Sequence, residues 1–280
     1  MHKVIWLLWY SGLSSAPQLV QDVAQSWFTQ NPGWDVRVVN STSLAAYLPG
    51  ARMEYPGMTP QALSDLIRLR LLDSHGGVWA DATLLCLASL DAWLHTAMQP
   101  SGFWMYHGAG WPPPKPVTRE NTRWPASWFM ASEAGAPLTA AWRAEAERFW
   151  TARDSAATAG QPVPYFWMDT LFRDLLASDA AFASAWACVP FLSCEEPGQP
   201  HMMLFRLHKR LGWDVRRVLR NKPPYVLKLS VKAWPARERR QSNIQVAVKY
   251  SRIRRNVTHA MDVPGRCQVT PGVPKSGGGS

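Results

Sequence analysis

Three charged side chains in the stretch SDLIRLRLLDSHGGVWADAT could take part in chemistry: Asp65, Arg68 and Asp81. Asp65 and Arg68 are three residues apart, so on a helix they share a face and can form an ion pair. Taken alone, such a pair is most often a solvated surface feature. Asp81 differs because it interrupts an apolar, strand-like run, where an unpaired carboxylate is costly to bury. We therefore expect a partner to pair with Asp81.

The segments around these residues predict a parallel α/β sheet. Short runs rich in aromatic and β-branched side chains indicate strands at residues 3–9, 34–40 and 78–86. Apolar residues at helical spacing separate the strands, at residues 15–30 and 59–75. Alternating strands and helices are typical of parallel sheets. Such sheets bind ligands beyond the carboxyl ends of their strands, which is where Asp81 is expected.

The ends of these elements carry local signals. Thr59 can cap the second helix, Pro60 suits its first turn, and Gly76 suits its end. The first strand ends in Trp9 and Tyr10, which places an aromatic face at the expected ligand crevice.

The second half of the chain gives weaker signals. Residues 102–135 are rich in loop signals, because GAGWPPPKPVTRENTRWP holds five prolines. A short strand is expected within this region, at 126–132. Further helices are expected at 136–154 and 164–186, and strand-like content occurs at 226–234 and 242–250.

Composition sets broad limits on the class of protein. The 280 residues allow one large domain, or one domain with a small appendage. No run approaches the ~18 apolar residues of a membrane span, and the opening residues predict a buried strand, not a signal peptide. The four cysteines fit neither a zinc motif nor a disulfide-dense domain, which predicts reduced, buried thiols. The final SGGGS is typical of a linker.

Positive charge is concentrated near the C-terminus. Residues 201–260 carry sixteen Lys and Arg against two acids, whereas the rest of the chain carries fourteen against eighteen. A block with a net charge of +14 attracts anions such as phosphates, an anionic membrane face or nucleic acid.

The Ser-Asp-x-x-Arg helix, the Gly-Gly pair, the aromatic residue and the acidic motif resemble a glycosyltransferase superfamily. It includes yeast-type mannosyltransferases with GT-A folds and clostridial glucosylating toxins. The nearest resemblance is to the bacterial capsular polysaccharide synthesis glycosyltransferase family, which writes the motif as Gly-Gly-x-Trp-x-Asp-Ala-Thr, as at residues 76–83. KVIWLLWYSG, SWFMAS, PHMMLFRL and YVLKLSVK are similar to further blocks, so the resemblance covers about residues 3–232. It implies a GT-A-like, Rossmann-type α/β sheet with flanking helices and a basic C-terminal extension.

The resemblance implies how a nucleoside-diphosphate sugar would bind. Trp9, with Tyr10 beside it, would stack on the base, although Trp9 could instead belong to the core. Asp65 and Arg68 would contact the donor sugar, and an arginine can also steady the departing phosphate.

The resemblance also implies Mg²⁺ or Mn²⁺ bridging the diphosphate, since hard cations prefer oxygen ligands. Asp81 matches the first acid of an Asp-x-Asp motif, whereas Thr83, after Ala82, replaces the second. Thr83 can offer a hydroxyl but no charge, so metal binding should be weaker or need another ligand. His201 is a candidate, although a lone histidine is more often structural. Leu227 stands where the family's C-terminal block usually begins with histidine, which removes another candidate.

Later residues have open alternatives. Lys228 and Lys232 match the lysines of the family's C-terminal block and could neutralise the diphosphate, or they could form a solvated strand face. Asp169 falls where the family often has histidine and could contact the acceptor or the sugar, or cap a helix. An aromatic acceptor cleft could form from residues near the loop region: Trp104, Tyr106, Trp111, Trp124, Trp128 and Trp167.

The leading hypothesis is a retaining hexosyltransferase of capsular or surface polysaccharide synthesis. It would move a hexose from a nucleoside-diphosphate sugar, UDP-sugar favoured, to a hydroxyl of a glycan or lipid-linked saccharide. The expected catalytic residues are Asp65, Arg68, Asp81 and Asp169. Residues 1–222 would form the transferase domain, 223–275 a basic segment that completes the donor site or contacts membrane, and 276–280 a linker.

Two alternatives stay open. One is a binding protein for anionic polymers or nucleic acid, although this function does not explain the Asp-x-x-Arg and Gly-Gly patterns. The other is a degenerate transferase that binds sugar nucleotide without turnover. For the transferase, a cytoplasmic location is expected, with a peripheral contact to the anionic inner face of the membrane, where each Lys or Arg adds about 1 kcal/mol.

Overall fold

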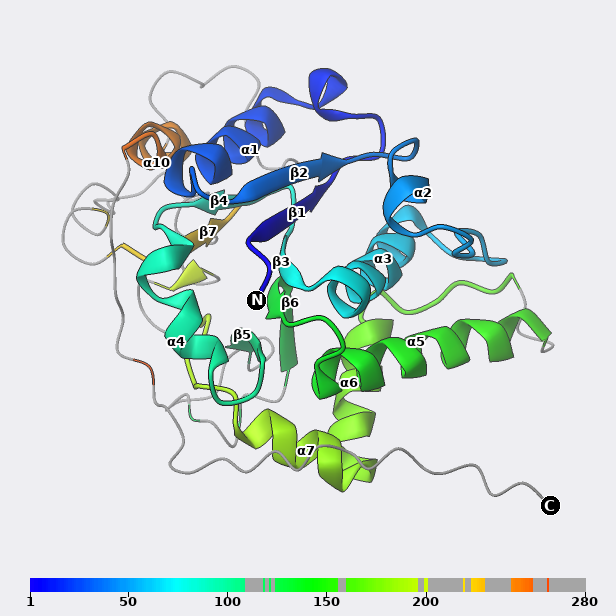
Figure 1. Ribbon diagram of the computed structural model, residues 1–280. Helices are drawn as coiled ribbons and strands as arrows, with labels where there is room; N and C mark the ends of the chain where they lie inside the picture. The colour runs from blue at the N-terminus through cyan, green and yellow to red at the C-terminus, as the bar shows by residue number, and fades with distance from the viewer. Residues whose placement is uncertain are drawn as a thin grey trace.

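The computed structural model describes residues 1–108, 118, 121, 124–155, 160–195, 199–200, 219, 223–229, 243–253 and 261. A five-stranded sheet of order β2-β1-β3-β6-β5 lies at its centre (Figure 1). The strands are β1 (Val4–Leu8), β2 (Asp35–Val39), β3 (Gly77–Ala80), β5 (Phe103–Gly108) and β6 (Trp124–Ser132). β1 pairs in parallel with β2 and β3, whereas β6 is antiparallel to β3 and β5. The predicted α/β sheet with flanking helices is confirmed, although the sheet is mixed and not wholly parallel.

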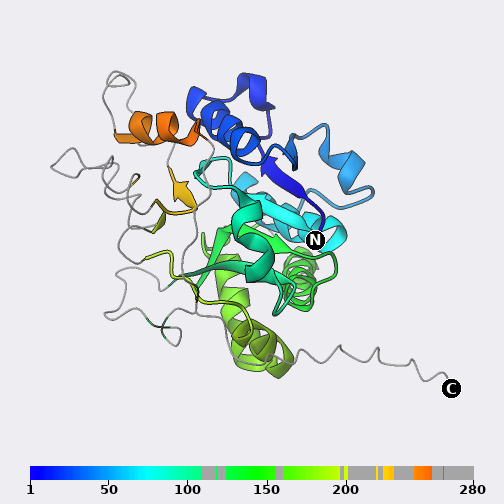
Figure 2. The same ribbon diagram turned by 60° about the vertical axis from the view of Figure 1, so that its left-hand side comes forward.

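Helices flank this sheet in two groups (Figures 1 and 2). One group contains α3 (Pro60–His75), α5 (Pro137–Ser155), α6 (Trp167–Ser178) and α7 (Ala180–Ala187), and the other contains α1 (Gln18–Gln30) and α10 (Asn243–Ser251). The short helices are η1 (Leu13–Ser15), α2 (Leu44–Tyr47), η2 (Leu90–Ala92) and α4 (Leu94–Met98). Among the described residues, no helix is long and apolar enough to cross a membrane.

The helix that carries Asp65 and Arg68 begins and ends as the sequence predicts. The side chain of Thr59 accepts a hydrogen bond from the Ala62 amide at 3.2 Å, and Pro60 is the first residue of α3. On its outer side α3 is tied to α5, because Arg70 pairs with Glu147 at 2.9 Å. Arg68, on another face of α3, reaches the sheet instead, where it donates to the Ser127 carbonyl of β6 at 2.7 Å.

The Gly-Gly pair between α3 and β3 is required by close packing. Gly76 has φ 67° and Gly77 has φ 94°, a region that residues with side chains rarely adopt. A Cβ atom on Gly77 would lie 2.5 Å from the carbonyl oxygen of Val4 on β1. The Gly76 carbonyl accepts a hydrogen bond from the Trp6 indole at 3.0 Å. The two glycines thus set the register of β3 and the position of the residues that follow it.

Residues 78–86 do not form one strand, so that prediction is wrong. β3 ends at Ala80, and β4 (Leu84–Cys86) belongs to a separate two-stranded sheet with β7 (Val226–Lys228). The Asp81 amide still donates to the Trp128 carbonyl at 2.9 Å, while the Asp81 carbonyl accepts from the Leu84 amide at 2.8 Å. This turn redirects the chain from one sheet to the other. Asp81 therefore lies just past the carboxyl end of a strand, not inside one.

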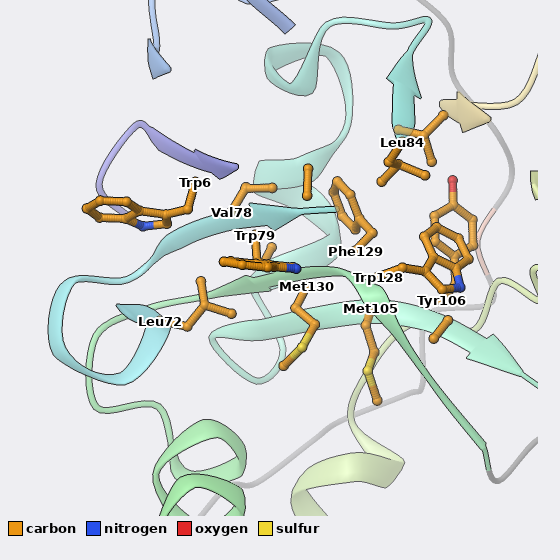
Figure 3. Packing of buried hydrophobic residues seen from close by; sticks show 14 of the residues in the cluster. Trp6, Leu72, Val78, Trp79, Leu84, Met105, Tyr106, Trp128, Phe129 and Met130 are labelled. Atoms are coloured by element: carbon orange, nitrogen blue, oxygen red, sulfur yellow. The ribbon is translucent and has the colours of Figure 1, made fainter. Parts of the chain in front are cut away.

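Aromatic side chains fill the core around the sheet, and Figure 3 shows Trp79, Trp128 and Phe129 among them. Phe129 also lies near rings from several elements, with centroids of Trp27 at 6.2 Å, Trp93 at 5.9 Å and Trp104 at 5.7 Å. Tyr106 stacks on the neighbouring Trp128 ring at 5.2 Å. Large buried rings contribute strongly to core stability. Trp104, Tyr106 and Trp128, expected as candidates for an acceptor cleft, are thus buried core residues.

Three other expectations need correction. Residues 242–250 were expected to be strand-like, but α10 spans most of them and packs on α1, where the side-chain Nε2 of Gln30 donates to the Ser251 carbonyl at 2.7 Å. β5 lies in a region expected to be mostly loop. Cys188 is disulfide-bonded, so the expectation that all four cysteines are reduced is wrong, although Cys86 and Cys194 are free and buried.

Candidate active site

A cluster of ion pairs lies at the carboxyl edge of the central sheet. Asp81 supplies one carboxylate, from the turn after β3. Its Oδ2 lies 2.5 Å from Lys228 Nζ, and its Oδ1 accepts a hydrogen bond from the Trp79 indole at 3.0 Å. A guanidinium nitrogen of Arg68 lies 3.5 Å from the same Oδ1. Asp81 thus faces two cationic side chains, Lys228 and Arg68, whereas the role of Asp81 toward a diphosphate and its metal stays a prediction.

The second sheet delivers Lys228 to this position. β4 and β7 pair with Leu84 opposite Lys228, and the Leu229 amide donates to the Thr83 carbonyl at 2.9 Å. β4 starts directly after the turn that holds Asp81, so pairing with β7 places the lysine beside the carboxylate. Residues 147 positions apart in the chain thereby form one ion pair.

Arg68 and Asp65 form the second part of the cluster, from one face of α3. Their ion pair is 2.8 Å long, at the predicted spacing of three residues. The guanidinium also donates to the Ser127 carbonyl at 2.7 Å and lies 5.1 Å from the centroid of the Trp79 ring. The Arg68 side chain is only 7% exposed, so this is not a solvated surface pair. These contacts fix the guanidinium between the two carboxylates.

Burial and charge set different proton affinities for the two carboxylates. Burial raises the pKa of Asp65 to about 6, against the opposing effect of Arg68. The indole of Trp167 donates to Asp65 Oδ2 at 3.1 Å and favours the ionised form. At Asp81, burial also opposes ionisation, but the charges of Lys228 and Arg68 outweigh it and hold the pKa of Asp81 below its usual value. Asp81 is therefore ionised at neutral pH, whereas Asp65, with a pKa of about 6, titrates just below neutral pH.

Asp169 lies within electrostatic reach of this cluster, in the first turn of α6. Burial, followed by the charge of Asp65, raises the pKa of Asp169 to about 7. Just before α6, Tyr165 is 77% exposed and Phe166 is 57% exposed, with ring centroids 4.9 Å apart. Partial burial and the charge of Asp65 raise the pKa of the Tyr165 hydroxyl. An exposed aromatic pair and a carboxyl group thus flank the ion-pair cluster.

A cavity of about 490 Å³ lies near the cluster, at the start of α3. It is within the size range of pockets that hold small organic ligands. Tyr10 is part of its wall and donates a hydrogen bond to the Pro60 carbonyl at 2.7 Å. Burial raises the pKa of Tyr10, which also feels the charges of Arg68 and Asp65. The apolar and aromatic wall residues are Tyr10, Met53, Tyr55, Met58, Pro60 and Leu63.

The structure brings together most of the predicted site residues. Asp65, Arg68, Asp81 and Lys228 are in contact through ion pairs, with Asp169 and Tyr10 nearby. Trp9, predicted as the base platform, does not line the cavity. Ala82 and Thr83 form the turn after Asp81. The predictions for His201, Lys232 and Trp111 fall outside the described residues.

Some residues of this site were missed or assigned another role by sequence reasoning. Trp167 was considered for an acceptor cleft, but its ring is buried and its indole holds Asp65. Tyr165 and Phe166 went unnoticed, although two aromatic residues directly before a helix that carries Asp169 were visible in the sequence. Met58 and Tyr55 lie in a segment without regular patterning, so no sequence signal pointed to their place in the cavity wall.

The residues of the site do not fit a divalent cation in the usual Asp-x-Asp manner. Thr83 stands where the motif has its second acid, so this position offers no carboxylate. The Thr83 carbonyl already accepts a hydrogen bond from the Leu229 amide. Both oxygens of Asp81 already have partners: Oδ2 has the Lys228 ammonium group, and Oδ1 has the Trp79 indole. Within the described part of the chain, no three His, Cys, Asp or Glu residues are grouped as metal ligands. Asp81 is therefore poorly placed as the single anchor of Mg²⁺ or Mn²⁺.

Comparison with known proteins assigns the chain to a family. The family model for capsular polysaccharide synthesis proteins matches residues 1–243, and the chain belongs to this family. A 110-residue stretch is 34% identical to glycosyltransferase afumC of Aspergillus fumigatus, covering 34% of this chain and 28% of that protein. A solved structure named PaToxG Glycosyltransferase aligns with 90% of this chain and 86% of its own at 10% identity, with a TM-score of 0.40.

Proposed function

We propose that the protein is a glycosyltransferase of capsular or surface polysaccharide synthesis. It moves a hexose from a nucleoside-diphosphate sugar, with UDP-sugar favoured, to a hydroxyl of a glycan or lipid-linked saccharide. The observation that carries this proposal is the cluster of Asp65, Arg68, Asp81 and Lys228 beside a ligand-sized cavity. Membership of the capsular polysaccharide synthesis family supports the same activity.

The donor base and ribose occupy the cavity near the start of α3. Its aromatic and thioether side chains provide apolar faces, and stacking of a base on an aromatic ring contributes roughly 1–3 kcal/mol. Tyr10 offers its ring there from the end of β1. The diphosphate then extends toward Arg68 and Lys228, whose charges suit it, and the sugar toward Asp65.

The acceptor approaches from the side of Tyr165 and Phe166. Sugars present apolar C–H faces that pack on exposed aromatic rings, and a carboxylate nearby can accept hydrogen bonds from their hydroxyls. Asp169 supplies that carboxylate. A pKa of about 7 leaves a substantial ionised fraction at neutral pH, so Asp169 can orient the attacking hydroxyl.

The transfer proceeds with retention of the anomeric configuration. The acceptor oxygen forms a bond to the anomeric carbon on the face from which the diphosphate departs. The bond between that carbon and the phosphate oxygen breaks, and the acceptor proton passes to the leaving phosphate. Arg68 stabilises the charge that develops on this phosphate, and no protein nucleophile is required.

The basic C-terminal quarter contributes to the location of the reaction. Its net charge of +14 over residues 201–260 suits contact with the anionic inner face of a membrane, where a lipid-linked acceptor resides. Cytoplasmic location with such a peripheral contact follows from this proposal.

The proposal can be tested by incubating the purified protein with a panel of UDP- and GDP-sugars and measuring donor binding and donor hydrolysis. We expect at least one donor to bind and to be slowly hydrolysed when water replaces the acceptor. Strong, salt-dependent binding of DNA or RNA with no donor binding would instead favour an anionic-polymer binding protein. Donor binding with neither hydrolysis nor transfer across many acceptors would identify a degenerate transferase.

A further inference from the structure

Every side-chain oxygen of Asp65 and Asp81 already has a cationic or N–H partner. Asp81 uses Oδ2 for Lys228 and Oδ1 for Trp79 and Arg68. Asp65 uses Oδ1 for Arg68 and Oδ2 for Trp167. A divalent cation at Asp81 would have to displace an ammonium group that lies 2.5 Å from Oδ2, or stand next to it against charge repulsion.

Backbone pairing places Lys228, the lysine that faces Asp81. Lys228 is opposite Leu84 in the β4–β7 pair, and the hydrogen bond between Leu229 and Thr83 holds the two strands together at this point. Earlier on the same strand segment, Tyr225 stacks on Trp93 with centroids 4.0 Å apart. The Lys228 side chain is only 18% exposed, so it is a built component of the site.

The two cations of the site have complementary properties. Arg68 is held by Asp65, the Ser127 carbonyl and the Trp79 ring, which leaves it little freedom to move. Its Nε is buried and has no hydrogen-bond partner among the described residues, which leaves a donor for a ligand oxygen. Lys228 is a flexible point charge whose ion pair is with Asp81. It can turn toward a phosphate while Arg68 and Trp79 continue to stabilise the ionised Asp81.

We infer that Lys228 occupies the position that a divalent cation takes in Asp-x-Asp transferases, and that Lys228 and Arg68 neutralise the donor diphosphate without a metal. This inference rests on the proposed function, because it presumes that the ligand is a nucleoside diphosphate. The loss of the second acid at Thr83 and the presence of a lysine opposite Asp81 then have one explanation. A site with a single acid loses affinity for the metal, and the ammonium group supplies the missing positive charge.

Calorimetry with UDP and GDP tests the inference without an acceptor. Protein stripped with EDTA should bind one of these nucleotides, and added Mn²⁺ should change its Kd by no more than about twofold. Lys228→Met should weaken binding roughly 10- to 100-fold, the range expected for loss of a charge-assisted hydrogen bond. Lys249→Met, which removes an exposed lysine of α10, is the matched control and should bind as the wild type does.

A second substitution tests the exchange of lysine for metal directly. Lys228→Asp places a second acid beside Asp81, so nucleotide binding by this variant should be weak in EDTA and restored by Mn²⁺. Lys228→Arg should retain part of the affinity without metal, and far-UV circular dichroism checks that each variant is folded. Wild-type binding that disappears in EDTA and returns with Mn²⁺ would overturn the inference, as would Lys228→Met binding as tightly as the wild type. If neither nucleotide binds in either condition, the proposed function itself is wrong.

Discussion

The hydrogen bond from the Trp167 indole to Asp65 allows a quantitative test of the site. Trp167→Phe keeps an aromatic ring against Phe149, whose centroid is 5.4 Å away, but removes the donor that lies 3.1 Å from Asp65 Oδ2. A hydrogen bond to a charged group contributes about 1.5–3 kcal/mol, and one to a neutral group about 0.5–1.5 kcal/mol. Because the pKa of Asp65 is about 6, roughly a tenth of it is ionised at pH 5 and nearly all at pH 8. The free energy lost should therefore be about 1 kcal/mol larger at pH 8 than at pH 5.

The sign of this pH dependence follows from the linkage between proton binding and folding. The folded-state pKa of Asp65 is above its ordinary value, so ionisation lowers the stability of the native state as pH rises from about 4 to about 6. Removing a donor that favours the ionised form raises this pKa further and deepens the loss at higher pH. Urea unfolding followed by far-UV circular dichroism, at pH 5 and pH 8, measures the difference from wild type at each pH.

Trp142→Phe is the matched control. Trp142 is also fully buried, and its indole donates at 3.1 Å to the Met168 carbonyl, a neutral acceptor. The decrease in the free energy of unfolding caused by Trp142→Phe should be the same at pH 5 and pH 8. If Trp167→Phe shows the same pH-independent loss as the control, the indole does not stabilise an ionised Asp65 and this view of the site's electrostatics is refuted.

Three further predictions concern the fold, the cavity and the acceptor side. Gly77→Ala should lower the free energy of unfolding by about 3 kcal/mol or more, because its Cβ would clash with the Val4 carbonyl. Gly135 has φ 69° but open space around it, so Gly135→Ala should lower the free energy of unfolding by only about 1–2 kcal/mol. Urea unfolding of both variants measures the difference. Tyr10→Leu should weaken nucleotide binding roughly 5- to 100-fold by calorimetry, and a larger effect of Trp9→Leu would restore the base platform predicted from sequence. The transfer rate should rise with pH through about 7 as Asp169 ionises, and Asp169→Asn should be slower and lack this rise; an unchanged profile would exclude the proposed role.

The elements that position the site could be predicted from sequence where local signals agree. The cap of α3 at Thr59 and its end at Gly76 were visible, and the parallel order of the first strands placed Asp81 at the carboxyl edge. Helical spacing predicted the ion pair between Asp65 and Arg68. It did not predict that the pair is buried, because burial depends on the Trp79 ring and the β6 backbone, which contact Arg68.

Other features depend on contacts between distant parts of the chain. The pairing of β4 with β7 decides that Lys228 reaches Asp81, and no local pattern encodes a contact across 147 residues. The turn after Ala80 was hidden within an apolar run, because strands on both sides of it are buried. α10 was mistaken for a strand, although its buried residues Ala247, Val248 and Ser251 have helical spacing.

Arg68 gives the most direct test of the central claim, that the ion-pair cluster at the sheet edge is the donor site. Arg143 on α5 offers the control, because it pairs with Asp73 and Glu147, and neither of these residues lines the cavity or belongs to the cluster. Calorimetry should compare UDP and GDP binding to wild type, Arg68→Met and Arg143→Met at a temperature where all three are folded. We expect Arg68→Met to weaken nucleotide binding at least about tenfold and Arg143→Met to bind within about twofold of wild type. Arg68→Met with wild-type affinity, or equal losses in both variants, would contradict the claim.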